Sequence, residues 1–219
     1  MPRTARASQG RFLYHVLNRG DARNDVFHKP EDYLAFVNLM REENEKVPMR
    51  PAGYCLMTNH FHLVLWPFHD GDLSRWMRWL MTSHVRRYHR YYDSSGHVWQ
   101  GRFKAFPIQN DDYYLTVLRY VERNPLRADM VARSQDWEWS SLKPTARSGP
   151  DGLPSDGPVP KRSQWTRFVN GVETNAELDV LRRSVARGTP FGDETWQQST
   201  AVQLGLESSL RPRGRPRKP

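Results

Sequence analysis

Residues 58–67 read TNHFHLVLWP, a short apolar segment that carries two histidines and predicts a β-strand. Because side chains alternate across a strand, His60 and His62 share one face. Positions i and i+2 lie roughly 6.6–6.8 Å apart along a strand, so the two imidazoles could converge on one metal ion. Two imidazoles leave coordination positions open, where a substrate phosphate could bind. The pair alone is weak evidence, since two partly exposed strand histidines without a ligand are the alternative.

The segments around this strand predict a small α+β domain. Apolar and β-branched runs predict strands at 12–19, 51–57, 60–67 and 97–108. Apolar residues at helical spacing predict helices at 30–46, 71–92 and 112–124. Pro125 should end the last helix, because it disfavours helical geometry at Asn124. The order βαββαβα is typical of a ferredoxin-like or RRM-like fold, with a mostly antiparallel sheet that carries helices on one face.

Composition divides the chain into three parts. Residues 1–140 form the α+β domain, 141–209 a linker with a short helical extension, and 210–219 a basic tail. The linker, at 144–160, is rich in Pro, Gly and Ser. Short helical patterns follow near 161–170, 176–187 and 193–205.

The charge of the chain indicates an acidic partner. The net charge is +9 and the isoelectric point about 9.9. Residues 1–20, 73–92 and 211–219 each carry several basic side chains and no acid. This distribution suits a polyanion that runs over the surface, with a solvated basic surface kept for solubility as the alternative.

Other features point to the cell interior. No apolar run approaches the ~18 residues that a membrane span needs. The N-terminal segment lacks the apolar stretch of a secretory signal. The single cysteine, Cys55, excludes an internal disulfide and a multi-cysteine zinc site. We therefore expect a cytoplasmic protein with no membrane partner.

The third predicted helix adds two polar side chains that could take part in catalysis. Asp111 or Asp112 could cap its start. Tyr120 and Asn124 are spaced i,i+4 and therefore lie on one face. A tyrosine hydroxyl is a plausible nucleophile, and an asparagine oxygen one turn away is a plausible third metal ligand. The alternative is that Tyr120 is a core aromatic and Asn124 merely ends the helix.

Several blocks of the sequence, in order, resemble the REP-associated tyrosine transposases, a branch of the single-tyrosine HUH transposases of bacterial insertion sequences. The resemblance covers nearly the whole chain. Its blocks are the opening MPRTAR, YHVLNRG (14–20), TNHFHLVLWP (58–67), GHVWQGRFKAFPI (96–108), LRYVERNPLRADMV (118–131), WEWSS (137–141), GTPFG (188–192) and LRPRGRPRKP (210–219).

This resemblance implies a metal-dependent transposase that cuts and rejoins single-stranded DNA. His60, His62 and Asn124 would hold Mg²⁺ or Mn²⁺, and Tyr120 would form a 5′-phosphotyrosine link. Many single-tyrosine transposases have Gln at the position of Asn124, so the third ligand departs from their pattern, though not from that of the REP-associated branch. The implied partner is single-stranded DNA with a short hairpin, as in repetitive extragenic palindromes, and not a small-molecule substrate. The resemblance favours a monomer associated with the nucleoid, with a dimer as the alternative.

Basic side chains in and around these blocks are the candidate DNA contacts. They are Arg19, Arg86, Arg87, Arg102, Arg211, Arg213, Arg215 and Arg217. Aromatic residues could add stacking surfaces; they are Trp76, Trp79, Tyr88, Tyr91, Tyr92 and Trp99. The alternative is that at least half of Trp76, Tyr88 and Trp99 belong to the core. The tail resembles an AT-hook, whose Arg-Gly-Arg core enters a narrow minor groove, and a basic tail without sequence preference is the alternative.

Two other function classes compete with catalysis. A domesticated, non-catalytic DNA-binding protein would not need the set of His60, His62, Tyr120 and Asn124. An RNA-binding protein would use the same sheet. However, the nearest approach to an RNP motif, GRFKAF (101–106), lacks the core of that pattern.

Overall fold

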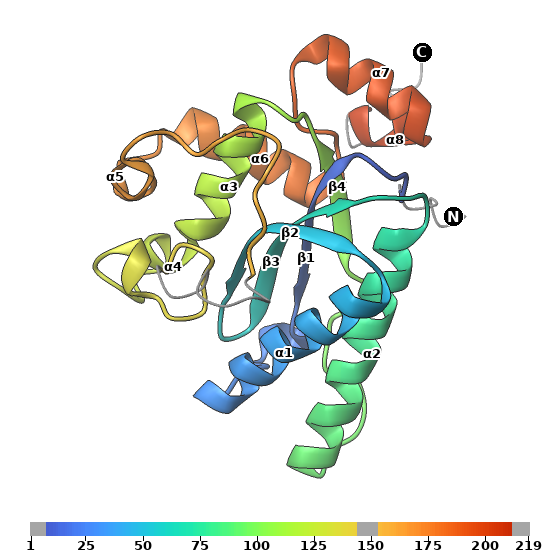
Figure 1. Cartoon of the computed structure of the whole chain (residues 1–219), viewed down its shortest axis with the longest axis vertical. Coiled ribbons are helices and arrows are strands. Elements are labelled where there is room, and N and C mark those ends of the chain that lie inside the picture. Colours follow the sequence, from blue (N-terminus) through green and yellow to red (C-terminus); the bar gives the residue numbers. More distant parts are fainter. Residues whose placement is uncertain (1–7, 144–152, 212–219) are drawn as a thin grey trace, which may run out of the picture.

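The computed structural model describes residues 8–143 and 153–211. Its centre is a four-stranded antiparallel sheet in the order β2-β3-β1-β4. The strands are β1 (Leu13–Arg19), β2 (Met49–Leu56), β3 (His60–Pro67) and β4 (Lys104–Ile108). β1 and β3 are therefore the two central strands, and both are paired along both edges (Figure 1).

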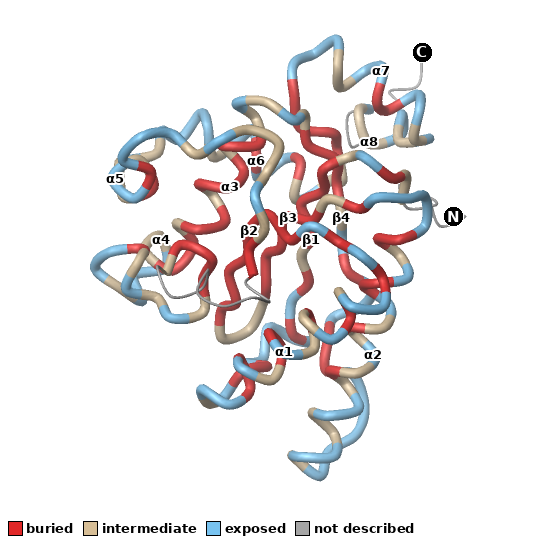
Figure 2. The backbone as a smooth tube through the Cα atoms, in the orientation of Figure 1, coloured by how far each residue is buried: buried red, intermediate tan, exposed pale blue. Residues whose placement is uncertain are grey.

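Helices cover both faces of the sheet. One core packs α1 (Pro30–Lys46) and α2 (Asp72–Tyr92) against residues such as Val16, Phe61 and Leu63. A second core packs α3 (Asp112–Glu122), α5 (Trp165–Asn170) and α6 (Asn175–Arg187) against Leu13 and Val64. The expectation of helices on one face only is wrong, because both alternating sets of side chains on β3 are apolar apart from the histidines. The strands are buried almost throughout (Figure 2).

The sequence located most elements of the domain. The helix predicted at 30–46 has those bounds, and the one predicted at 71–92 is α2. The strand predicted at 97–108 is shorter, since regular pairing begins only at Lys104. The preceding loop forms an isolated bridge, Gly20 to Trp99, just beyond the end of β1. The third helix ends at Glu122, and α4 (Asn124–Arg127) follows it directly, with Pro125 in its first turn.

The helical extension forms short helices, and it packs on the domain. Its elements are α5, α6, α7 (Glu194–Leu204) and α8 (Glu207–Leu210). The segment 188–192 runs beside β4, where Phe191 and Ile108 form a parallel bridge. Of the predicted linker, residues 144–152 lie outside the described part of the chain. Within 8–143 and 153–211, no helix combines the length and the apolar character needed to cross a membrane.

Candidate active site

The two histidines of β3 are each held by a hydrogen bond at Nδ1. His60 Nδ1 lies 2.7 Å from Asn59 Oδ1, which can only accept, so Nδ1 carries the proton and Nε2 the lone pair. His62 Nδ1 lies 2.8 Å from Nε2 of His15, on the neighbouring strand β1. The rings of His15 and His62 are stacked with centroids 4.9 Å apart. Both metal-ligand candidates thus have Nδ1 occupied and Nε2 left for another partner.

Burial keeps these imidazoles neutral. Burial, together with a smaller effect of the positive charge of Arg19, lowers the pKa of His60 to about 4. Burial also places the pKa of His62 well below 6.5 and lowers that of His15 to about 3. A neutral imidazole is the form that binds a metal. At neutral pH the site therefore needs no deprotonation before an ion can bind.

Tyr120 and Asn124 lie beside the histidines. Asp111 caps α3 by accepting a hydrogen bond from the Tyr113 backbone N–H, and Tyr120 lies near the other end of this helix. The ring centroid of Tyr120 is 5.7 Å from that of His62. Asn124, at the start of α4, is 8% exposed and hydrogen-bonds the His60 side chain. The side chains that the sequence placed on two separate elements therefore meet at one site.

These four side chains line a single open cavity of about 600 Å³. Its other lining residues are Leu17, Asn18, Arg19, Gln100, Gly101, Arg102, Lys104 and Val185. Three of them are basic, and within the described residues none of the lining side chains is a carboxylate. The cavity thus combines neutral metal-binding groups, a tyrosine hydroxyl and a positive rim, which suits a phosphodiester.

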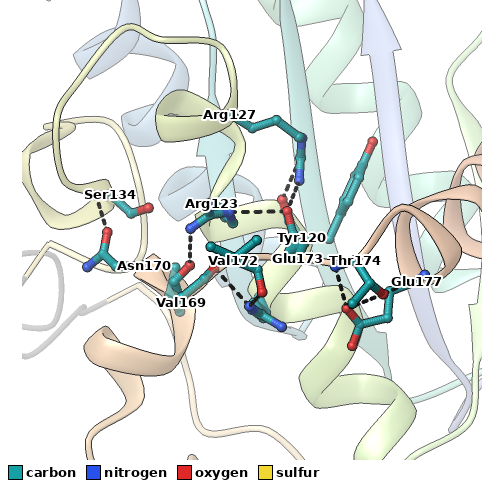
Figure 3. A network of polar contacts seen from close by, with 12 residues as sticks. Tyr120, Arg123, Arg127, Ser134, Val169, Asn170, Val172, Glu173, Thr174 and Glu177 are labelled. Carbon is teal, nitrogen blue, oxygen red and sulfur yellow. Dashed lines mark hydrogen bonds and ion pairs between the residues drawn. The ribbon is translucent and has the colours of Figure 1, made fainter.

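A polar network joins arginines near Tyr120 to residues of the extension (Figure 3). The Arg127 guanidinium lies 4.0 Å from the centroid of the Tyr120 ring and donates to the Tyr120 carbonyl at 3.0 Å. Glu173, in the loop between α5 and α6, accepts from Arg127 at 2.8 Å and from Arg123 at 3.2 Å. Arg119 donates to the carbonyls of Gly171 and Val172. The position of the nucleophile candidate therefore depends on residues far along the chain.

A buried carboxylate fixes the other side of α3 to the extension. Glu122 is completely buried. Its oxygens accept from Ser141 Oγ at 2.8 Å, from Lys161 Nζ at 2.9 Å and from Trp165 Nε1 at 2.6 Å. A Cβ at Gly53 would overlap the Leu118 side chain, so glycine at this point of β2 lets α3 lie close to the sheet. Together these contacts fix the distance between α3 and the strand that carries the histidines.

The donor set fits a divalent metal with an incomplete shell. Within the described residues, no three His, Cys, Asp or Glu side chains are grouped so that they could hold a metal ion. A metal here would therefore use the two imidazole Nε2 atoms and the Asn124 amide oxygen. His60 Nδ1 donates to Asn59, as metal-bound histidines usually donate from their second nitrogen. The hydrogen bond between His62 Nδ1 and His15 Nε2 fixes the His62 ring. Remaining positions would be open toward the cavity, where substrate oxygens could enter.

The comparisons with known proteins identify a family for this chain. The sequence profile described as "Transposase IS200 like" matches residues 8–124, more than half of the chain. The chain belongs to the IS200-like transposase family. The matched region contains His60, His62, Tyr120 and Asn124. No curated protein matches the chain.

The transposase also shares its fold with a solved structure, that of a REP-associated tyrosine transposase bound to a REP hairpin. The TM-score is 0.55 at 18% sequence identity, over 72% of this chain and 97% of the other. A second structure, assigned as a transposase from Deinococcus radiodurans R1, matches with a TM-score of 0.38 at 16% identity, over 55% of this chain and 96% of the other. The first likeness establishes the fold, and the second carries no argument.

The predicted DNA contacts of the transposase fall into several places. Arg19 and Arg102 line the catalytic cavity. Arg86 lies on a separate groove, whereas Arg87 is exposed and lines neither surface. Arg211 is exposed at the end of α8. The other tail arginines, Arg213, Arg215 and Arg217, lie outside the described residues, so the AT-hook prediction stays a prediction.

Two of the aromatic residues proposed as stacking surfaces belong to the core. Trp76 is completely buried and Trp99 is 5% exposed, so neither presents a ring face to a base. Tyr88 is half-buried. The alternative that at least half of Trp76, Tyr88 and Trp99 are core residues is therefore confirmed. Many of the aromatic residues of the chain pack in the core on the α1–α2 side of the sheet.

Sequence reasoning missed two side chains of the site. His15 alternates with apolar neighbours on β1, and its contact with His62 depends on the pairing register, which opposes Leu17 to His62. Arg127 lies seven positions after Tyr120, a spacing that a continuous helix would place on one face. Pro125 lies between them and predicted that the helix ends before Arg127. A signal for His15 exists only in retrospect, as a fully buried histidine in an apolar strand.

Proposed function

We propose that this transposase is a metal-dependent endonuclease and strand transferase that acts on single-stranded hairpin DNA of the REP type. The observation that carries the proposal is a single cavity lined by Tyr120 and by two histidines, each of which has its Nδ1 atom in a hydrogen bond. DNA binding alone would need neither the neutral imidazole pair nor the adjacent hydroxyl. The REP hairpin bound by the relative with the same fold supports the choice of substrate.

The chemistry is a transesterification at phosphorus. The Tyr120 oxygen attacks the scissile phosphate and loses its proton to solvent. The bond from phosphorus to the 3′ oxygen breaks, and the released 3′ oxygen takes up a proton. The product is a 5′-phosphotyrosine link and a free 3′-hydroxyl, which can reverse the step on the same or another strand without ATP. A bound Mg²⁺ or Mn²⁺ would supply Lewis-acid stabilisation of the phosphate charge.

The protein's own residues prepare this step. Arg127 lies against the tyrosine ring and its guanidinium is fixed by Glu173, so the phenol is held in one orientation. Arg19, Arg102 and Lys104 give the cavity a positive rim for the phosphodiester backbone. Because His60, His62, Tyr120 and Asn124 of one chain share the cavity, we propose that a monomer is competent. Its place of action would be the nucleoid, in the cytoplasm.

The test is formation of a covalent protein–DNA adduct on a denaturing gel. End-labelled hairpin DNAs are incubated with the protein and Mg²⁺, Mn²⁺ or EDTA. We expect an adduct that requires metal and disappears in Tyr120→Phe. The matched control is Tyr113→Phe, on the same helix but outside the cavity, which should keep the adduct.

Three outcomes would count against the proposal. An adduct that survives Tyr120→Phe would exclude Tyr120 as the nucleophile. Tight hairpin binding with no adduct across a broad pool of hairpins would favour the domesticated, non-catalytic DNA-binding protein. An adduct that forms equally well in EDTA would remove the metal from the mechanism.

A further inference from the structure

A second, larger hollow lies beside the catalytic cavity. It runs between α2 and the loop 96–103 and has a volume of about 980 Å³. Its lining from α2 recurs at helical spacing, at Ser74, Arg78, Met81 and Val85. We call it the α2 groove. The C-terminal turns of α2 extend beyond the core and are exposed (Figure 2), so the groove is open to solvent along this helix.

Four arginines make the α2 groove strongly basic. Arg75, Arg78 and Arg86 come from α2 and Arg102 from the loop, and all four are exposed. Among the described residues that line the groove, none is acidic. Within the described part of the chain, Arg75 alone of these four has an ion-pair partner, Asp72 at 2.9 Å. From Arg75 to Arg86 the helix rises roughly 16 Å, so the charges form a line along the groove.

The side chains between the arginines are apolar. Met81 and Val85 are half-buried, and Val98 and Phe103 form the floor with 8% and 6% of their surface exposed. Paired bases in duplex DNA present only their edges, because stacking covers their faces. Apolar side chains beside a line of cations instead suit an unpaired strand, whose bases present open faces.

The α2 groove is continuous with the catalytic cavity. Gly101 and Arg102 line both hollows. The Gly101 carbonyl accepts from the Asn18 side chain at 3.0 Å, and Asn18 also lines the cavity. The loop is further fixed to the end of β1, where the Gln100 backbone N–H donates to the Arg19 carbonyl at 2.9 Å. A strand that leaves the cavity past Arg102 therefore enters the groove directly.

We propose that the α2 groove holds the unpaired DNA strand that adjoins the scissile phosphate. The backbone lies along Arg75, Arg78 and Arg86, and the bases rest against Met81 and Val85. This inference rests on the proposed function, because it needs a phosphodiester in the catalytic cavity. It assigns the groove to recognition of the unpaired strand, separately from the hairpin stem.

Paired charge changes on one helix test the inference. The groove variant is Arg78→Gln with Arg86→Gln, and the control variant is Arg87→Gln with Arg90→Gln. Each pair removes two exposed positive charges from α2, but only the first pair lines the groove. All proteins also carry Tyr120→Phe, so that binding is measured without cleavage. The probes are a hairpin with about ten unpaired nucleotides on each side, within the usual reach of single-strand sites, and the same hairpin without them.

Fluorescence anisotropy at several salt concentrations gives the affinity and its salt slope. The unpaired flanks should raise the affinity of the control variant and of the parent protein, and this gain should be lost in the groove variant. The slope of log K against log salt should also become shallower in the groove variant with the flanked probe. Each lost phosphate contact on a single strand reduces its magnitude by roughly 0.7, so the two lost arginines should reduce it by about 1.4.

Two results would overturn the inference. Equal losses in the two variants would mean that the groove arginines act only through net charge. A loss that is as large for the hairpin without flanks would place the duplex stem in the groove. Failure of the proposed chemistry is a distinct outcome, because it would show as a missing adduct in wild-type protein while these binding differences persist.

Discussion

Replacing His15 by phenylalanine should weaken metal binding, although His15 is not itself one of the proposed ligands. The change keeps a ring in the stack with His62 but removes the nitrogen that lies 2.8 Å from His62 Nδ1. Hydrogen-bond partners of metal-bound histidines typically contribute 10–100-fold to metal affinity, equivalent to about 1.4–2.8 kcal/mol. The freed Nδ1 is also left buried without a partner, which should lower the free energy of unfolding by about 1–3 kcal/mol.

Isothermal titration with Mn²⁺ measures the affinity, and urea unfolding measures the stability. The matched control is Phe106→Leu, because Phe106 packs edge-on against His15 with centroids 4.9 Å apart and makes no bond to the histidine pair. This control should lose stability and keep Mn²⁺ affinity, whereas His15→Gln, which retains a polar group, should recover part of the affinity. If His15→Phe binds Mn²⁺ within a factor of about two of wild type while losing stability, then His15 only packs.

Other parts of the structure yield three further predictions. Glu122→Ala should lower the free energy of unfolding by about 3–5 kcal/mol, because it leaves buried hydrogen-bond donors unpaired. The control Glu138→Ala, at an exposed ion pair, should lower it by less than about 1 kcal/mol. Equal losses of the two variants in urea unfolding would refute this. Burial lowers the pKa of His84 to about 3, so the unfolded chain binds an extra proton between about pH 6.5 and 3, and stability must fall as the pH drops through that window. His84→Phe and His84→Leu should both reduce the slope of unfolding free energy against pH by about 1.4 kcal/mol per unit, and an unchanged slope in either would show that His84 does not titrate this way. Arg127→Met should slow single-turnover adduct formation by about tenfold or more with hairpin affinity kept, because the tyrosine ring loses the cation against it; an unchanged rate would remove Arg127 from the positioning of Tyr120.

The parts of this fold that the sequence predicted are those that local patterns determine. The period of apolar residues placed α1 and α2, and the alternation around His60 and His62 placed both histidines on one face of β3. The wrong expectation of a one-sided sheet had the same origin. Alternation shows which residues share a face, but it does not show that a later segment of the chain covers the second face.

The site itself depends on information that no local pattern carries. His15 meets His62 only because β1 pairs with β3 in one register, and a slip of one residue would turn His15 to the opposite face of the sheet. Family resemblance pointed to Tyr120 and Asn124, which the structure brings to the same cavity as His60 and His62. It did not recover Arg127 or Glu173, which act through contacts with each other and with the Tyr120 ring.

The extension is the strongest case, because composition separated it from the domain while in the structure it contributes to the candidate site. Val185 of α6 lines the catalytic cavity, and Glu173 fixes the arginine that lies against Tyr120. The buried Glu122 accepts hydrogen bonds from Lys161 and Trp165 and so fixes α3 to the same segment. A helix that carries a nucleophile must be held on both sides if the hydroxyl is to stay within reach of a phosphate. In this transposase the sheet holds one side of α3, and the extension holds the other.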